Sequence, residues 1–179
     1  MDTSKVYLDT CLLIGCFKWL LEKNYQHQFI EKILLLVKRE KEQPFIITFL
    51  KEHKNIEKFI SLVSVAEIIS VLKYNKDFRH YKLTLGEINN LLVVLMTMIG
   101  FEIIVEIEID GKKIKGNLIT RAINNYIDKH EHVLDCIHVD IAKTNDLLFI
   151  TNEDKFGLLK DLDCHIMTFN KLVKQFEKS

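Results

Sequence analysis

Acidic side chains stand at four places in the chain where an apolar segment ends or a helix is expected to begin. They are Asp9, Glu67, Asp135 and the adjacent pair Glu153 and Asp154. Ligands of open parallel α/β sheets bind at the edge where the strands end, and carboxylates gathered at that edge repel one another unless a cation lies between them. Oxygen ligands with few histidine or thiolate partners suit Mg²⁺ or Mn²⁺. The pattern predicts a metal-dependent phosphoryl-transfer site.

Composition sets broad limits on the fold and the partners. The chain has 179 residues, which fits a single domain over 1–179 with a substantial core. Its 25 Lys+Arg balance 25 Asp+Glu. A nucleic-acid partner must therefore bind to local basic patches, because overall charge does not attract it. This neutrality counts against a high-affinity, non-specific nucleic-acid binder.

Several common sites are excluded by what the sequence lacks. With 6 Gly and 1 Pro, it contains neither GxxxxGK[ST] nor GxGxxG, so nucleotide binding through these motifs has no support. The four cysteines form no CxxC pair, there is no HExxH, and buried reduced thiols are expected. The N-terminus lacks an apolar signal region, and the longest apolar run, 91–99, is too short to span a membrane. A cytoplasmic protein without a membrane partner is expected.

Apolar periodicity predicts strands that alternate with helices. Strands are expected at 6–8, 59–65, 101–109, 147–150 and 165–168, and helices at 12–21, 25–41, 66–74, 88–99, 112–126, 133–143, 156–159 and 170–178. The segment 45–47 fits either a short strand or a helical turn. This alternation favours a parallel sheet covered on both faces. The expected fold class is α/β, a three-layer α/β/α sandwich whose mainly parallel sheet has about four to five strands.

Helix-start signals offer a second interpretation of the acidic residues. Ser64 and Glu67 have the spacing of a capping box, as do Thr84 and Glu87, while Gly100 is expected to end the helix before it. Asp9 fits the N-cap of the first helix. Asp135 would favour the positive end of a helix, and Glu153 and Asp154 could be ordinary turn residues. Each carboxylate therefore has a purely structural alternative to a metal-binding role.

Four segments, taken in order, resemble the motifs of the PIN-domain nucleases, the family that includes the VapC toxins. The segments are Val-Tyr-Leu-Asp-Thr at 6–10, Ser-Val-Ala-Glu at 64–67, Asp-Cys-Ile-His-Val-Asp-Ile-Ala at 135–142 and Phe-Ile-Thr-Asn-Glu-Asp-Lys-Phe at 149–156. Two positions depart from the family pattern. Glu153 stands where the family has Asp, with Asp154 next to it, and Cys11 stands where the family often has Asn.

The resemblance implies a metal-dependent endoribonuclease, a hydrolase that is the toxin of a toxin–antitoxin pair or an RNA-processing enzyme. The alternative is an inactive scaffold that binds RNA or protein. The implied cofactor is Mg²⁺ or Mn²⁺, held by Asp9, Glu67, Asp135 and either Glu153 or Asp154, with Glu153 favoured in the catalytic set. Thr10, Ser64 and Thr151 are expected to hydrogen-bond a ligating carboxylate or a water, and His138 is expected to support the site from the core. Implied partners are RNA, an antitoxin protein and a second copy of the chain.

Two basic stretches are candidates for contacting RNA. The first contains Lys73, Lys76, Arg79 and Lys82, and the second contains Lys112, Lys113 and Lys115. Tyr74, Phe78 and Tyr81 interleave with the first stretch and are expected to offer stacking surfaces. The structural alternative for both stretches is a solvated surface loop.

Overall fold

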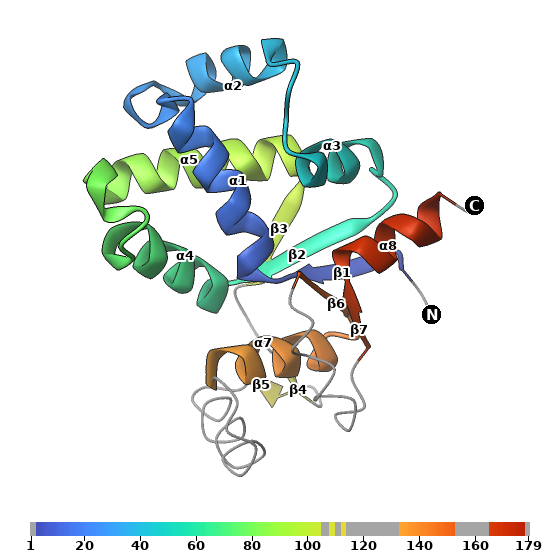
Figure 1. The fold of residues 1–179 in the computed structure, drawn as a ribbon. Coiled ribbons are helices and arrows are strands. Elements are labelled where there is room, and N and C mark those ends of the chain that lie inside the picture. The colour runs from blue at the N-terminus through green and yellow to red at the C-terminus, as the bar shows by residue number, and fades with distance from the viewer. Residues whose placement is uncertain (1–2, 105–107, 110–111, 114–132, 153–164, 178–179) are drawn as a thin grey trace.

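A five-stranded parallel sheet forms the centre of the computed structural model (Figure 1). The structure describes residues 3–104, 108–109, 112–113, 133–152 and 165–177. The strands are β1 (Lys5–Leu8), β2 (Glu57–Ser61), β3 (Phe101–Ile104), β6 (Leu148–Thr151) and β7 (Ile166–Thr168). Their order is β3-β2-β1-β6-β7, and every neighbouring pair is parallel. The expected α/β class and the number of strands are confirmed.

Helices cover both faces of this sheet. They are α1 (Thr10–Glu22), α2 (Ile30–Arg39), α3 (Phe45–Glu52), α4 (Leu62–Tyr74), α5 (Leu85–Ile99), α7 (Val133–Thr144) and α8 (Phe169–Phe176), with 3-10 turns η1 (Tyr25–His27) and η2 (Arg79–Tyr81). In Figure 1, α7 lies on the opposite side of the sheet from α1 and α5. The three-layer arrangement is confirmed. Of the helices in the described ranges, none combines the length and the apolar character needed to cross a bilayer.

The central strand β1 is buried on both faces, which explains its continuous apolar sequence. Val6 and Leu8 belong to the large core under α1, α3 and α5, whereas Tyr7 belongs to a smaller core with Phe149 and the inner face of α7. Successive side chains of a strand point to opposite faces. The side chain of Tyr7 therefore points to the face of the sheet that α7 covers.

The predicted helix ends are borne out at one capping box and wrong at the other. Thr84 and Glu87 form the predicted box at the start of α5, and Gly100 ends that helix with φ of 75°. The second box is not the one predicted, because Ser61 is the N-cap and pairs with Ser64. The Ser61 hydroxyl accepts the Ser64 amide at 3.2 Å. Helix α4 therefore begins at Leu62, earlier than expected.

Three further expectations require correction. The segment 25–41 is not one helix, because the chain is extended at Gln28 and Phe29 between η1 and α2, and Phe29 is 81% exposed. The undecided segment 45–47 is helical and follows Pro44, whose fixed φ suits a helix start. The last helix, predicted over 170–178, spans Phe169–Phe176 and has Thr168 at its N-cap position.

The long predicted strand over 101–109 ends early. It is divided into β3 and the two-residue strand β4 (Glu108–Ile109), which pairs antiparallel with β5 (Lys112–Lys113). This pairing places Lys112 and Lys113 in a strand, where a helix was predicted. The remainder of that predicted helix, and the one at 156–159, lie outside the described residues.

Candidate active site at the carboxyl edge of the sheet

The strand order creates a switch point between β1 and β6. The chain leaves β1 toward β2 on one side, whereas it leaves β6 toward β7 on the other. Ligands of open α/β sheets bind in the crevice beyond the carboxyl ends of two such strands. Asp9 follows β1 directly and Asn152 follows β6 directly. The topology therefore places Asp9 at the position where this fold is suited to bind a ligand.

Asp9 is buried and held by donors from two segments. It is 6% exposed. Its Oδ2 accepts hydrogen bonds from Thr151 Oγ1 at 2.6 Å and from Cys11 Sγ at 3.0 Å. The residue occupies the N-cap position of α1, but its side chain makes no capping hydrogen bond. Over the described ranges no lysine or arginine forms an ion pair with Asp9, so this buried carboxylate has no cationic partner there.

Cys11 acts as a neutral donor next to Asp9. Burial, followed by the Asp9 charge, raises the pKa of the thiol to about 12. The sulfur also accepts the Asn152 amide at 3.5 Å. Cys11 thus connects the segments after β1 and β6, and as a protonated thiol it donates to Asp9 at neutral pH.

Glu67 lies on α4 and binds a histidine from α7. Its Oε2 is 3.0 Å from His138 Nε2. Burial works against ionisation of Glu67, but the His138 hydrogen bond, with smaller contributions from Thr10 and from the His138 charge, holds the pKa of this carboxyl below its ordinary value. The capping-box alternative for Glu67 is wrong, because Ser64 occupies the position that completes the cap of α4.

A buried polar chain continues from His138 to the centre of the sheet. His138 has no exposed surface, and its Nδ1 is 2.8 Å from the Tyr7 hydroxyl. That hydroxyl also lies 2.7 Å from Ser61 Oγ and 2.9 Å from Ser64 Oγ. Each ring nitrogen of His138 thus has one partner, Glu67 at Nε2 and the Tyr7 hydroxyl at Nδ1. Desolvation by burial raises the pKa of Tyr7 to about 12, which keeps it a hydroxyl.

The three expected hydroxyl donors have different surroundings. Thr151 donates to Asp9, whereas Ser64 bonds Tyr7 and the Ser61 amide. The Thr10 hydroxyl is close enough to Glu67 to lower its pKa. It nevertheless makes no hydrogen bond of good geometry and is a buried oxygen without a partner among the described side chains and backbone. A buried hydroxyl without a partner indicates a missing water or ligand.

Asp135 stands in the first turn of α7 and is half-buried. This helix ends shortly before β6 begins, so its first turn lies toward the carboxyl edge of the sheet. Asp135 precedes His138 by one turn, and the same helix contributes the buried Asp140. The fourth acidic position, Glu153 or Asp154, lies outside the described residues. Within the described ranges, no three Asp, Glu, His or Cys side chains form a group arranged to hold a metal ion.

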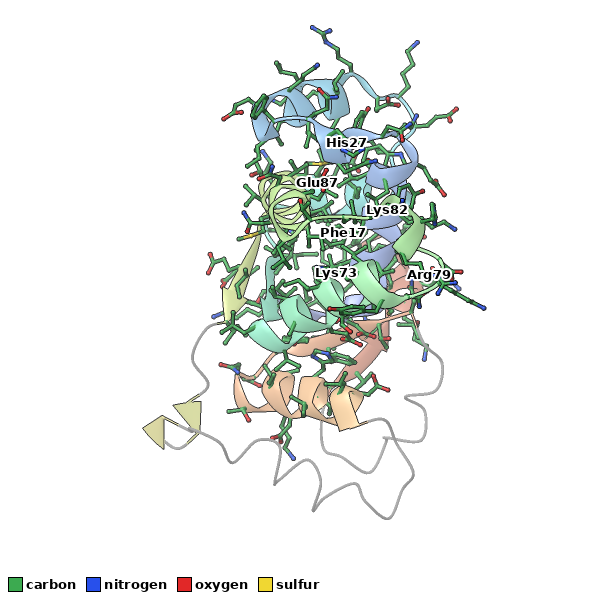
Figure 2. All side chains as sticks on the ribbon, turned by 90° about the vertical axis from the view of Figure 1, so that its left-hand side faces the viewer. Phe17, His27, Lys73, Arg79, Lys82 and Glu87 are labelled. Atoms are coloured by element: carbon green, nitrogen blue, oxygen red, sulfur yellow. The ribbon has the colours of Figure 1, made fainter. Side chains whose placement is uncertain are left out.

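The first basic stretch is at the surface beside this edge. Lys76, Arg79 and Lys82 are exposed and Lys73 is half-buried, and Figure 2 shows Lys73, Arg79 and Lys82 on α4 and the segment after it. Tyr74 is 75% exposed, but Phe78 is 5% exposed, so the expectation that Phe78 offers a stacking surface is wrong. Of the second stretch, the side chains of Lys112 and Lys113, and all of Lys115, lie outside the described part of the structure.

Sequence reasoning missed Tyr7 and the dual role of Cys11. A tyrosine in a fully buried strand must find a partner for its hydroxyl, and that requirement is a signal that could have identified Tyr7. Its partners are 54 to 131 residues away, so their identity could not be obtained from local spacing. Cys11 was treated as a small apolar residue, although its position two residues after Asp9 allows the thiol to fold back onto the carboxylate.

The donor set suits a hard divalent cation. Asp9 and Glu67 supply carboxylate oxygens, and the unpartnered Thr10 hydroxyl is adjacent in sequence to the first and close to the second. Mg²⁺ retains several waters and needs only one or two direct carboxylates. The ligand types present, two carboxylates and a hydroxyl that can bond water, are those that such an ion accepts.

Comparisons with known proteins give overall likeness only. No family model matches the chain, and no curated protein matches it. VapBC2 from Rickettsia felis, bound to a DNA fragment from its promoter, is 13% identical with a TM-score of 0.48, covering 92% of this chain and 98% of that one. A toxin–antitoxin complex from Klebsiella pneumoniae is 15% identical with a TM-score of 0.45, covering 91% and 96%. These values are too low to transfer a residue's role or an activity to this chain.

Proposed function

We propose that the protein is a metal-dependent endoribonuclease whose active site is the carboxyl edge between β1 and β6. The observation that carries the proposal is Asp9, a buried carboxylate fixed by Thr151 and Cys11 at the switch point with no cationic partner among the described residues. Burying a charge without a partner is costly. A cation bound beside Asp9 would offset that cost.

Each side chain has a proposed task. Asp9, Glu67 and Asp135, with Glu153 or Asp154, would hold Mg²⁺ or Mn²⁺ and the attacking water. When bound, such an ion supplies charge neutralisation on the phosphate oxygens and lowers the pKa of a bound water.

Supporting residues keep these carboxylates in place. Thr151 and Cys11 orient Asp9, and His138 orients Glu67. The Thr10 hydroxyl is available to bond a water between them. Correct positioning of this kind matters because phosphoryl transfer depends mainly on alignment and electrostatics.

The proposed biological role is that of a toxin with an antitoxin partner, or of an RNA-processing nuclease. Support comes from the ordered resemblance of segments 6–10, 64–67, 135–142 and 149–156 to the PIN-domain motifs. A second copy of the chain and an antitoxin protein are proposed as partners on the same ground. RNA is the proposed substrate.

A non-catalytic scaffold that binds RNA or protein is the second candidate. One observation favours it: no group of three metal-binding side chains converges within the described ranges. The two candidates differ in one respect that can be measured. A nuclease needs its carboxylates to hold a cation, whereas a scaffold does not.

Cleavage of a panel of structured RNAs tests the proposal. Wild-type protein is compared in Mg²⁺, in Mn²⁺ and in EDTA with Asp9→Asn and with Asp146→Asn, a matched change at an exposed acid between α7 and β6. We expect cleavage by wild type and Asp146→Asn in either metal, and its loss in EDTA and in Asp9→Asn. Cleavage that survives both EDTA and Asp9→Asn would contradict the proposal, and a complete lack of cleavage by folded wild-type protein would favour the scaffold.

A further inference from the structure

A strip of four cations continues from the end of α4. Lys73, Lys76, Arg79 and Lys82 recur every three residues, and the only acid between the first and the last is Asp77. Four cations and one acid give a net charge of +3 over ten residues, in a chain whose net charge is zero. We call these four residues the cationic strip. Charge concentrated in this way is what a neutral protein needs to attract a polyanion.

The backbone of the cationic strip is anchored to the core, and its charges have no acidic partner among the described residues. Phe78 and Leu83, each 5% exposed, anchor the segment in the main core. Asn75 Oδ1 accepts the Asp77 amide at 2.9 Å, and Lys82 adopts a left-handed backbone with φ of 51°. No described residue accepts a hydrogen bond or forms an ion pair with the four cationic side chains. The strip therefore presents ordered positive charge to solvent (Figure 2).

Helix α4 connects this strip with the candidate active site. Tyr74 follows Glu67 by seven residues, which is close to two full turns, so both side chains leave the same face of the helix. The rise between them is about 10 Å. Tyr74 is 75% exposed, and its ring packs against no other aromatic ring within the described ranges. An exposed aromatic side chain thus stands next in sequence to Lys73 of the cationic strip and about two turns along α4 from Glu67.

We propose that Tyr74 and the cationic strip bind a single-stranded segment of the RNA substrate, next to the phosphodiester that is cleaved. This inference rests on the proposed function. The strip contacts phosphates, and Tyr74 stacks on one base. Single-stranded RNA is favoured over duplex RNA because an exposed aromatic ring needs an unstacked base. It is favoured over an acidic peptide because such a peptide offers charge without a base to stack.

Binding is measured without cleavage, so that the two proposals can fail separately. Fluorescence anisotropy of a labelled single-stranded RNA oligonucleotide is recorded in EDTA, with Asp9→Asn in every protein. The test variant changes Lys76, Arg79 and Lys82 to Gln. The control variant changes Lys32, Lys38 and Lys41 to Gln, three exposed cations in or just after α2. Each phosphate contact contributes about 0.7 to the slope of log K against log salt for a single strand.

The test variant is expected to lose about 2 from this slope, since three contacts are removed, while the control keeps the parent slope. Tyr74→Ala is expected to weaken binding about 5- to 150-fold, the range for one lost base stack, and Tyr74→Trp is expected to retain binding. Phe29→Ala, at another exposed aromatic residue, is expected to have no effect.

The inference would be overturned if the test and control variants lost the same amount from the salt slope, or if Tyr74→Ala bound as tightly as its parent. It would also be overturned if duplex RNA or polyglutamate bound as tightly as the single strand. Failure of the proposed function looks different. If only the proposed function fails, the parent protein still binds RNA through the cationic strip, but wild type with Mn²⁺ does not cleave that RNA. Cleavage by wild type together with unchanged binding by both variants would remove this inference alone.

Discussion

Replacing Tyr7 with Phe removes one buried hydroxyl and leaves the ring in place. The ring continues to stack on Phe149, whose centroid is 5.8 Å away. The hydroxyl has three partners at 2.7 to 2.9 Å. Ser61 and Ser64 keep their mutual capping bonds, but His138 Nδ1 loses the one partner that the structure gives it. A net bond contributes about 1 kcal/mol and an unsatisfied buried group costs about 1–3 kcal/mol, so the expected destabilisation is about 3 kcal/mol.

Thermal and urea unfolding measure this effect. For a chain of this size, about 3 kcal/mol corresponds to a Tm decrease of about 6–12 °C. Tyr25→Phe is the matched control, because among the described residues its hydroxyl bonds one group, the Glu40 carboxylate at 2.9 Å. It is expected to cost about 1.5 kcal/mol, the low end for a bond to a charged group. If Tyr7→Phe unfolds within 1–2 °C of wild type, on the same order as measurement scatter, the buried polar chain does not stabilise the fold.

Other predictions concern the helix cap, the pH dependence and Cys11. Thr84→Ala removes the N-cap of α5 and is expected to lower the free energy of unfolding, measured in urea, by about 1 kcal/mol. The Thr84 amide, with smaller contributions from its hydroxyl and from His27, holds the pKa of Glu87 below its usual 4.5. Ionised Glu87 therefore stabilises the fold above pH 4.5, and this stabilisation is lost as pH falls through the lowered pKa. The free energy of unfolding of Glu87→Gln should be lower than that of wild type at pH 7 and approach it in acid. Cys11→Ala removes a donor to Asp9 and should slow RNA cleavage about fivefold, whereas Cys11→Asn, which retains a donor, should not; equal rates would refute an orienting role.

Local sequence patterns predicted the parts of the fold that depend on near neighbours. The apolar run before Asp9 predicted β1, and the Thr84–Glu87 spacing with Gly100 predicted both ends of α5. Parallel strands that alternate with helices also follow from periodicity. These features need only interactions within a few residues, so the sequence contains the information directly.

Features that depend on distant partners could not be obtained in this way. The spacing predicted Ser64 as the N-cap of α4, but Ser61 is the N-cap and Ser64 completes the box. Both hydroxyls also bond Tyr7, which is 54 and 57 residues away in sequence. Glu67 had the spacing of a cap, yet its partner is His138, 71 residues later. Phe29 fitted a helical apolar face but stands in solvent, because the chain is extended there. In each case tertiary packing overrode a local preference.

Divalent-metal binding to the apo protein tests the central claim most directly. Asp9→Asn removes a buried charge and keeps an oxygen to accept the Thr151 hydrogen bond, so in EDTA we expect its Tm to equal or exceed that of wild type. Adding Mn²⁺ should raise the Tm of wild type by several degrees, about 2.7 kcal/mol of stabilisation at a hundredfold excess over Kd, and leave Asp9→Asn unchanged. Asp146→Asn should respond like wild type. An equal Mn²⁺ response in wild type and Asp9→Asn, or no response in wild type, would contradict the account.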